Sequence, residues 1–188
     1  MHNIIIFASG AGSNTNAIIN YFKRKNKVKV ALVVTNNTDA GVLEIAKSND
    51  IPFLIVNKKT FQETLLLEQL SGYNPDLIVL AGFLWKIPPF LLSNFANKII
   101  NIHPALLPKY GGKGMYGKSV HDAVIAAGDS QSGITIHYVD DKYDNGMIIM
   151  QATCTIDEHC TTSDLALKIR KLEHYFFPRV IEFILDNH

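Results

Sequence analysis

Apolar runs with strand character alternate with segments of helical character along most of the chain. The strand-like runs cover residues 4–8, 28–34, 53–56, 77–80 and 99–102, and the helix-like segments between the early runs cover residues 14–25, 40–48 and 61–71. Continuously apolar strands are typical of a parallel sheet that is buried on both faces, and parallel neighbours need crossover helices. The alternation therefore predicts an α/β fold with a mostly parallel central sheet flanked by helices.

The pattern changes in the C-terminal part. Residues 133–138 and 147–155 have strand character, and the polar segment between them ends in Asn145-Gly146, a strong turn signal. A long final helix, capped near Thr162-Ser163-Asp164 and running toward Asp186, follows. We expect a C-terminal β-hairpin, a long terminal helix and one domain over residues 1–188, because 188 residues suffice for a single well-packed core.

The net charge of the chain limits the kinds of partner that it can bind, and the spacing of its cysteines indicates their redox state. The chain has 18 Lys and Arg against 17 Asp and Glu, a formal charge of +1, so no global field favours nucleic acid or an anionic membrane. The N-terminus lacks the features of a signal peptide and no apolar run approaches membrane-spanning length, which predicts a cytoplasmic protein. Cys154 and Cys160 form no CxxC pair, and we expect both to be reduced.

The segment Asn101-Ile102-His103-Pro104 ends a short β-branched run. Side chains two apart on a strand share a face, so Asn101 and His103 are expected to project together, and Pro104 favours extended backbone at His103. An amide and an imidazole side by side suit a reaction in which oxygen charge develops and a proton moves. A histidine bonded within the core is the alternative. Asp144 is a candidate third group if the hairpin folds over the strand ends, although Asp-Asn-Gly is also ordinary turn chemistry.

The first strand leads into Ser9-Gly10-Ala11-Gly12-Ser13-Asn14, and a helix follows at once. Backbone N–H groups and the positive end of the helix dipole predict a phosphate site here. The dinucleotide pattern is incomplete, because Thr15 replaces its third glycine, and no Gly-Lys-Ser/Thr follows as in a P-loop. A plain turn with Ser13 or Asn14 as N-cap remains the alternative.

A metal site is a further possibility that the spacing disfavours. His103, His121, His137 and Asp144 could converge, but none has a tight ligand spacing, so no metal is expected. The longest expected loop, residues 104–117, is rich in glycine, and loops of this length tend to be functional or mobile.

Several motifs occur together in a specific order. They are Gly12-Ser13-Asn14, Leu80-Ala81-Gly82-Phe83, Asn101-Ile102-His103-Pro104-x-Leu106-Leu107-Pro108, Gly133-x-Thr135-x-His137, Asp144-x-Gly146 and Glu173-His174 followed by Pro178. Over nearly the whole chain this order resembles the glycinamide ribonucleotide formyltransferases, the folate-dependent transformylases of purine synthesis. The resemblance implies a single-domain, Rossmann-like formyltransferase fold.

The resemblance also implies the reaction. A formyl group would pass from 10-formyltetrahydrofolate, the donor co-substrate, to the primary amine of phosphoribosyl glycinamide, with no metal. Asn101 and His103 would stabilise the oxyanion that forms when the amine attacks, and His103 would also manage a proton. Asp144 would orient His103 and favour its charged form. The expected partners are small molecules rather than nucleic acid or membrane, and the protein would be a monomer or a homodimer.

The binding residues follow from the same resemblance. Gly12, Ser13 and Asn14 match the loop that holds the substrate phosphate, and Glu173 matches a residue near the glycinamide amine, although alone it reads as a solvated helix carboxylate. The residues expected to bind the folate are Leu84, Trp85, Lys86, Ile87, Asn101, Asp140, Asp141 and Tyr143. Trp85 stands where many relatives carry a basic side chain, so Lys86 or Lys59 would have to compensate.

Other readings stay open. The same core pattern occurs in methionyl-tRNA formyltransferase, formyltetrahydrofolate hydrolase and sugar-nucleotide formyltransferases. The first two normally carry an additional domain, for which we expect no room in this chain, and the near-neutral charge disfavours tRNA. A non-catalytic module that binds a phosphate ligand would need only the Gly12-Ser13-Asn14 loop.

Overall fold

The computed structural model describes residues 1–187, which form one seven-stranded sheet in the order β3-β2-β1-β4-β5-β6-β7. The strands are β1 (His2–Phe7), β2 (Val28–Thr35), β3 (Phe53–Ile55), β4 (Leu77–Leu80), β5 (Ile99–His103), β6 (Gln131–Tyr138) and β7 (Ile148–Thr155). The first five strands pair in parallel, and β6 and β7 are antiparallel to their neighbours. This confirms the predicted α/β class, the mostly parallel sheet and the C-terminal hairpin.

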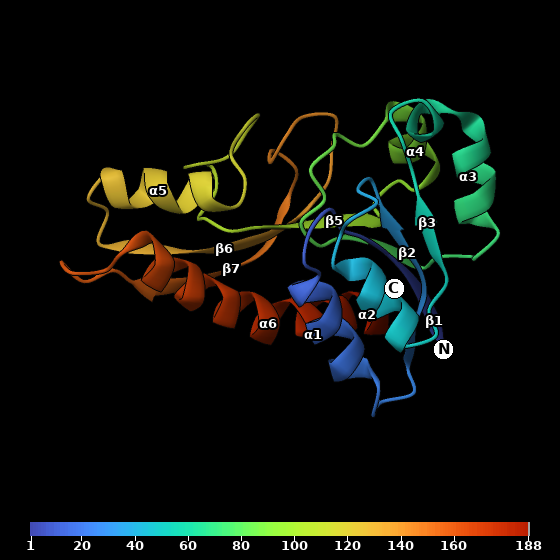
Figure 1. Ribbon diagram of the computed structural model, residues 1–188, viewed down its shortest axis with the longest axis horizontal. Helices are drawn as coiled ribbons and strands as arrows, with labels where there is room; N and C mark the ends of the chain where they lie inside the picture. The colour runs from blue at the N-terminus through green and yellow to red at the C-terminus, as the bar shows by residue number, and fades with distance from the viewer. Residues whose placement is uncertain (188) are drawn as a thin grey trace.

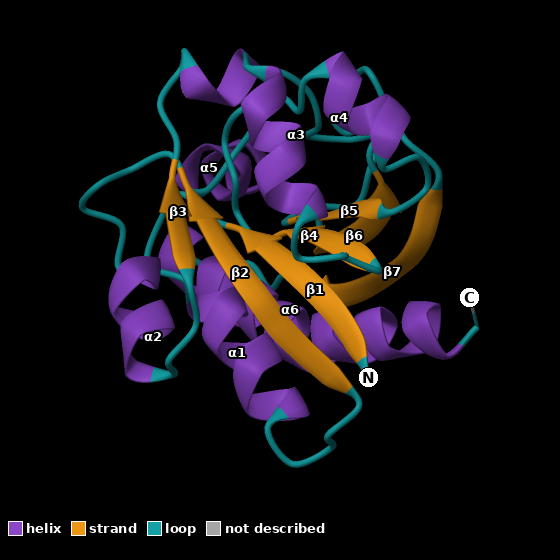
Figure 2. Ribbon diagram, turned by 90° about the vertical axis from the view of Figure 1, so that its right-hand side faces the viewer, coloured by secondary structure: helices purple, strands orange, loops and turns teal. Residues whose placement is uncertain are grey.

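Helices cover both faces of the sheet (Figures 1 and 2). They are α1 (Ser13–Phe22), α2 (Val42–Ser48), α3 (Thr64–Ser71), α4 (Pro89–Asn94), α5 (Lys118–Ala126), α6 (Thr162–Asp186) and a 3₁₀ turn, η1 (Thr60–Gln62). Buried side chains of α1, α2 and α6 pack against one face, and those of η1, α3 and α4 pack against the other. Coverage of both faces explains why the parallel strands consist largely of apolar residues.

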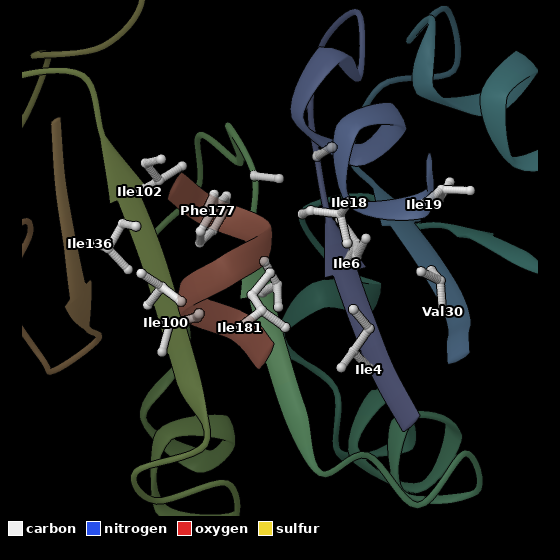
Figure 3. Packing of buried hydrophobic residues seen from close by; sticks show 14 of the residues in the cluster. Ile4, Ile6, Ile18, Ile19, Val30, Ile100, Ile102, Ile136, Phe177 and Ile181 are labelled. Atoms are coloured by element: carbon white, nitrogen blue, oxygen red, sulfur yellow. The ribbon is translucent and has the colours of Figure 1, made fainter. Parts of the chain in front are cut away.

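The long helix α6 contacts the sheet through its apolar stripe. Figure 3 shows Phe177 and Ile181 of α6 in the same buried cluster as the strand residues Ile100, Ile102 and Ile136. Ile100 and Ile102 occupy the core face of β5, as the alternation predicted, which leaves Asn101 and His103 on the opposite face. Packing of α6 therefore determines which face of β5 is available for chemistry.

Helix α6 begins at Thr162, and its N-cap lies one residue before the predicted capping segment. Thr161 is the N-cap: its hydroxyl accepts a hydrogen bond from the Asp164 backbone N–H at 3.2 Å, and the Asp164 carboxylate accepts one from the Thr161 N–H at 3.0 Å. This reciprocal capping box fixes the start of the helix that carries Glu173.

Other boundaries also differ from the prediction. Helix α1 ends at Phe22 and α3 begins at Thr64, after the 3₁₀ turn, so both are shorter than their sequence patterns. The sequence did not predict α4 or α5, because α4 is a short helix opened by Pro89 and α5 follows the glycine-rich loop. The hairpin connection spans residues 139–147, so Asn145-Gly146 lies within a longer loop rather than forming a two-residue turn.

The strand order reverses direction between β1 and β4. From β1 the chain proceeds to β2 and β3 on one side, whereas β4 and β5 lie on the other. Loops that leave the carboxyl ends of such adjacent strands diverge, and the resulting crevice is the usual ligand site of an open α/β sheet. None of the helices described in residues 1–187, α6 included, combines the length and apolar character required to span a bilayer.

Candidate functional site

A cleft of about 680 Å³ opens at the carboxyl ends of β1, β4 and β5. The glycine-rich loop, the hairpin connection and α6 complete its walls. Its lining includes residues 9–14, 81–84, 101–104 and 112–117, together with His121, Tyr143, Asp144, Ala166, Ile169, Arg170 and Glu173. Of the residues predicted to act in catalysis or to bind the substrate, all lie in this lining: Gly12, Ser13, Asn14, Asn101, His103, Asp144 and Glu173.

His103 is buried, with 3% of its surface exposed, and both ring nitrogens face oxygen atoms. Nε2 lies 2.8 Å from the backbone carbonyl of Tyr110, and Nδ1 lies 3.6 Å from Asp144 Oδ1. A carbonyl oxygen only accepts, so Nε2 carries a proton. The Asp144 oxygen is close enough for an ion pair but beyond a hydrogen bond, which leaves Nδ1 able to engage a ligand.

Asp144 connects the hairpin loop to the glycine-rich loop. Its backbone has a φ of 52°, and its side chain is 11% exposed. Its Oδ2 accepts a hydrogen bond from the Gly112 N–H at 2.9 Å, and a Cβ at Gly111 would lie 3.2 Å from the Asp144 Cβ. The glycines therefore permit this loop to pack directly on the carboxylate. The segment is anchored on its other side by Tyr110, whose hydroxyl donates to Asp129 at 2.8 Å.

A second buried histidine, His137, lies beside the first. It is the cross-strand partner of Asn101 in the β5–β6 pair and is 2% exposed. Its Nδ1 lies 2.8 Å from the Tyr138 carbonyl, and its Nε2 lies 3.1 Å from Asn101 Nδ2 and 3.8 Å from Asp144 Oδ1. Burial lowers the pKa of His137, although the Tyr138 carbonyl and the Asp144 charge act in the opposite direction.

The start of α1 forms the opposite wall of the cleft. Gly12 is the N-cap, with a φ of 77°, and it has no side-chain cap, so the alternative in which Ser13 or Asn14 caps the helix is wrong. The first turn contains no acidic residue. Uncapped N–H groups at a helix N-terminus favour an anion.

Glu173 is not the solvated helix carboxylate that its sequence position alone suggested. Its Oε2 accepts a hydrogen bond from Asn14 Nδ2 at 3.1 Å, which joins α6 to the start of α1. Burial raises the pKa of Glu173, while the Asn14 bond and the nearby Arg170 charge oppose that rise. The structure thus unites two residues that are far apart in sequence.

The residues predicted to bind the folate divide into two groups. Leu84, Asn101 and Tyr143 line the cleft, whereas Trp85, Lys86, Ile87, Asp140 and Asp141 lie outside its lining. Trp85 packs against Phe61, with ring centroids 5.4 Å apart, so the aromatic ring has a structural partner. Asp140 accepts hydrogen bonds from the Lys142 N–H and the Asn145 side chain, both at 2.8 Å, and so shapes the hairpin loop.

Sequence reasoning assigned no role to Arg170, which lines the cleft, and considered His137 only as a possible metal ligand. His137 lies outside the cleft lining but contacts Asn101. Arg170 lies one helical turn before Glu173, and the spacing of three on α6 was the signal that could have placed both on one face. His137 alternates with Ile136 on β6, which indicated that it faces away from the core. Lys118, the first residue of α5, pairs with Asp122 at 2.8 Å.

The side chains considered as metal ligands are His103, His121, His137 and Asp144. His103, His137 and Asp144 do converge, yet within residues 1–187 no group of three or more His, Cys, Asp or Glu side chains is arranged to hold a metal ion. Hydrogen bonds to backbone carbonyls occupy one nitrogen of each of the two imidazoles.

Comparisons with known proteins agree with this architecture. The formyl transferase family model matches residues 2–181. The phosphoribosylglycinamide formyltransferase of Bacillus subtilis (strain 168) is 39% identical over 191 residues, which cover 98% of this chain and 95% of the relative. The chloroplastic phosphoribosylglycinamide formyltransferase of Vigna unguiculata is 37% identical over 98% of this chain, which spans only 61% of that relative's length.

A solved structure extends the agreement to three dimensions. The phosphoribosylglycinamide formyltransferase of Anaplasma phagocytophilum matches with a TM-score of 0.90 and 33% identity, over 98% of this chain and 87% of that one. Similarity in sequence and similarity in structure both extend over almost the whole length of the chain. The chain therefore belongs to the formyl transferase family.

Proposed function

We propose that this protein transfers a formyl group from 10-formyltetrahydrofolate to the primary amine of phosphoribosyl glycinamide. One observation carries the proposal: Asn101, His103 and Asp144 meet in the same cleft as the uncapped N-terminus of α1. The first group suits acyl transfer and the second suits a phosphate. The names of the bacterial and plant relatives support the acceptor and the transferred formyl group.

The phosphoribosyl half of the acceptor would bind at α1. The backbone N–H groups of Ser13 and Asn14 would hold the phosphate, and Arg170, which lines the same cleft, would add a full positive charge. Glu173, bonded to Asn14, would lie toward the acceptor's amine. This arrangement would aim the amine away from α1 and toward β5, so that it meets the donor in a fixed orientation.

The chemistry would occur between β5 and the hairpin loop. Attack of the amine on the formyl carbon converts its carbonyl oxygen to an oxyanion, which Asn101 Nδ2 and the Nδ1–H of a protonated His103 would stabilise. Collapse of this intermediate breaks the bond between the formyl carbon and the donor's nitrogen, which leaves the formyl group on the acceptor. The attacking amine loses a proton, and the donor's nitrogen gains one. Asp144, 3.6 Å from His103 Nδ1, would hold the imidazolium in place during this exchange.

The donor would supply the formyl carbon in activated form when bound beside β4. Leu84, 45% exposed, and Tyr143, 41% exposed, present apolar surface at the cleft, as a flat heterocycle requires. Trp85, Lys86, Ile87, Asp140 and Asp141 would contribute only to parts of the donor that extend beyond the cleft lining. We further propose that residues 1–188 act as a single domain on small-molecule substrates.

The test is a spectrophotometric assay with purified protein, 10-formyltetrahydrofolate and phosphoribosyl glycinamide. We expect deformylated folate to accumulate only when the amine is present. Equal release without the amine would identify a hydrolase. Absence of release from folded protein that still binds the folate would indicate another acceptor, such as a sugar nucleotide, and binding of phosphate ligands without folate would indicate a non-catalytic module.

A further inference from the structure

The contacts of His137 determine which hydrogen bonds its neighbours can make. Its Nδ1 lies 2.8 Å from the Tyr138 carbonyl, which can only accept, so Nδ1 carries the proton. In a neutral ring, Nε2 then has a lone pair and can only accept. That nitrogen lies 3.1 Å from Asn101 Nδ2.

We propose that His137 is a positioning residue for formyl transfer: as a neutral imidazole protonated on Nδ1, it fixes the amide orientation of Asn101 and reserves Asp144 for His103. The inference deepens the proposed function and rests on it. It concerns a side chain that need not touch either substrate.

The first consequence concerns Asn101. An asparagine amide has a donor end and an acceptor end of nearly equal shape, so the strand alone does not determine which end faces the cleft. The Nε2 lone pair accepts from the NH₂ group and would repel Oδ1. One N–H is therefore directed at His137, and the second N–H of the same group stays available to an oxyanion. In the opposite orientation, Asn101 would present an oxygen to His137 and the bond would be lost.

The second consequence concerns Asp144. Its Oδ1 lies 3.6 Å from His103 Nδ1 and 3.8 Å from His137 Nε2, so distance alone does not select between the two rings. An unprotonated Nε2 offers Asp144 no proton, and a neutral ring offers no charge. The carboxylate is thus left to pair with His103, the ring that faces the reaction.

The surroundings of His137 keep it neutral. The charged or titratable groups that act on it are Asp144 and Asp140, which favour its protonation, and His103, which opposes it. Burial is the strongest influence and lowers the pKa of His137, since a ring 2% exposed has little access to water. A protonated His103 would disfavour a second positive charge beside it.

The direct test is long-range ¹H–¹⁵N NMR of the full-length protein without ligands, because the ¹⁵N pattern of a histidine ring distinguishes its two neutral tautomers and its charged form. The His137→Gln variant assigns the signal. We expect His137 to be neutral and protonated on Nδ1 at pH 7. A ring protonated on Nε2, or a charged ring, at this pH would overturn the proposal, and this readout does not depend on which substrate the enzyme uses.

Kinetics of paired variants provide the second test. In His137→Gln the side-chain oxygen can accept from Asn101, whereas His137→Leu retains an apolar side chain and removes the acceptor. We expect His137→Leu to lower kcat about tenfold to 100-fold with little change in KM, and His137→Gln to restore most of the loss. Added to Asn101→Ala, His137→Leu should cost little more, because both changes act on one interaction. Equal losses in both variants, or losses that multiply with Asn101→Ala, would contradict the role.

Discussion

At the scale of single residues, the site depends on two side chains of β5 that share a face. Asn101 and His103 point away from the core because Ile100 and Ile102 are buried on the other side. Each then has its own partner across the sheet or loop: His137 for Asn101, and Tyr110 with Asp144 for His103. The strand positions the pair, and the partners orient it.

The proposed chemical groups lie on β5, whereas the proposed phosphate site lies at the start of α1. This separation predicts how alanine variants behave. We expect Asn101→Ala to lower kcat by about 10²- to 10³-fold, because it would remove the proposed donor to the oxyanion, and His103→Ala to lower it by a similar factor. The affinity for phosphoribosyl glycinamide should persist, since the α1 N-terminus and Arg170 remain. Steady-state kinetics and calorimetric titration of the acceptor measure the two quantities separately.

His159→Ala is the matched control, because His159 is exposed and lies outside the cleft lining. Its kinetics should equal those of the unmodified protein. A parallel loss of acceptor affinity and turnover in the Asn101 or His103 variants would count against separate binding and chemical groups.

The raised pKa of Glu173 predicts that the stability of the fold depends on pH. Because burial raises its pKa in the folded protein above the ordinary value of 4.5, ionising this carboxyl destabilises the fold. The penalty is absent below pH 4.5, develops as the pH rises through the folded-state pKa, and is fully present above it. Glu173→Gln, whose amide oxygen can still accept from Asn14, should therefore raise the melting temperature at pH 8.

The comparison requires melting curves of both proteins across the pH range. The gain should shrink toward acidic pH and vanish below pH 4.5, where Glu173 is protonated in both folded and unfolded chains. A constant gain at every pH would mean that the substitution acts through packing rather than through charge.

At the scale of elements, the junction between β1 and α1 depends on one glycine. Gly12 has a φ of 77°, and a Cβ there would lie 2.8 Å from Ile45 Cδ1 and 2.9 Å from the Val42 Cα. Both the backbone conformation and the close approach of α2 exclude a side chain. The need for glycine at this position is therefore structural, while the open N–H groups that follow it are available for binding.

We expect Gly12→Ala to destabilise the fold by about 1–3 kcal/mol through left-handed strain and overlap with α2. Chemical denaturation measures the change. Gly10→Ala is the matched control, because no atom lies within 4 Å of a Cβ at Gly10 and its φ is not in the left-handed region. Equal stability of the two variants would contradict the packing argument.

The local sequence pattern was sufficient to predict those elements whose own residues have a characteristic spacing or composition. The alternation in β5 predicted the face shared by Asn101 and His103, and the glycines predicted the turn before α1. The sequence could not establish that Asn101 lies opposite His137, since that depends on the register of β5 against β6. Nor could it show that Asn14 of α1 contacts Glu173 of α6, or that Trp85 packs on Phe61, because these contacts exist only after folding.

At the scale of the whole molecule, the core that joins α6 to the sheet also assembles the cleft. Phe177 is fully buried among strand and helix residues and lies one turn beyond Glu173 on α6 (Figure 3). Loss of this packing should displace the helix that supplies Arg170 and Glu173 to the site. We therefore expect stability and binding of the proposed substrate to be coupled through α6.

Phe177→Ala should lower the free energy of unfolding by about 3–5 kcal/mol, because it removes a large buried side chain and leaves a cavity. Phe183→Ala on the same helix is the control: Phe183 is 63% exposed, so its loss should change stability by about 0.5 kcal/mol or less. Denaturant titrations of both variants provide the comparison. Similar losses of unfolding free energy in the two variants would show that α6 is not held to the sheet by the face that carries Phe177.

The destination of the formyl carbon distinguishes transfer to an amine from hydrolysis of the donor. We would incubate the protein with phosphoribosyl glycinamide and 10-formyltetrahydrofolate labelled with ¹³C at the formyl carbon, and follow the label by NMR. We expect the label to move into a formamide on the acceptor's amine, in step with release of the deformylated folate. Label that appears instead as free formate, with the amine unmodified, would contradict the proposed transfer.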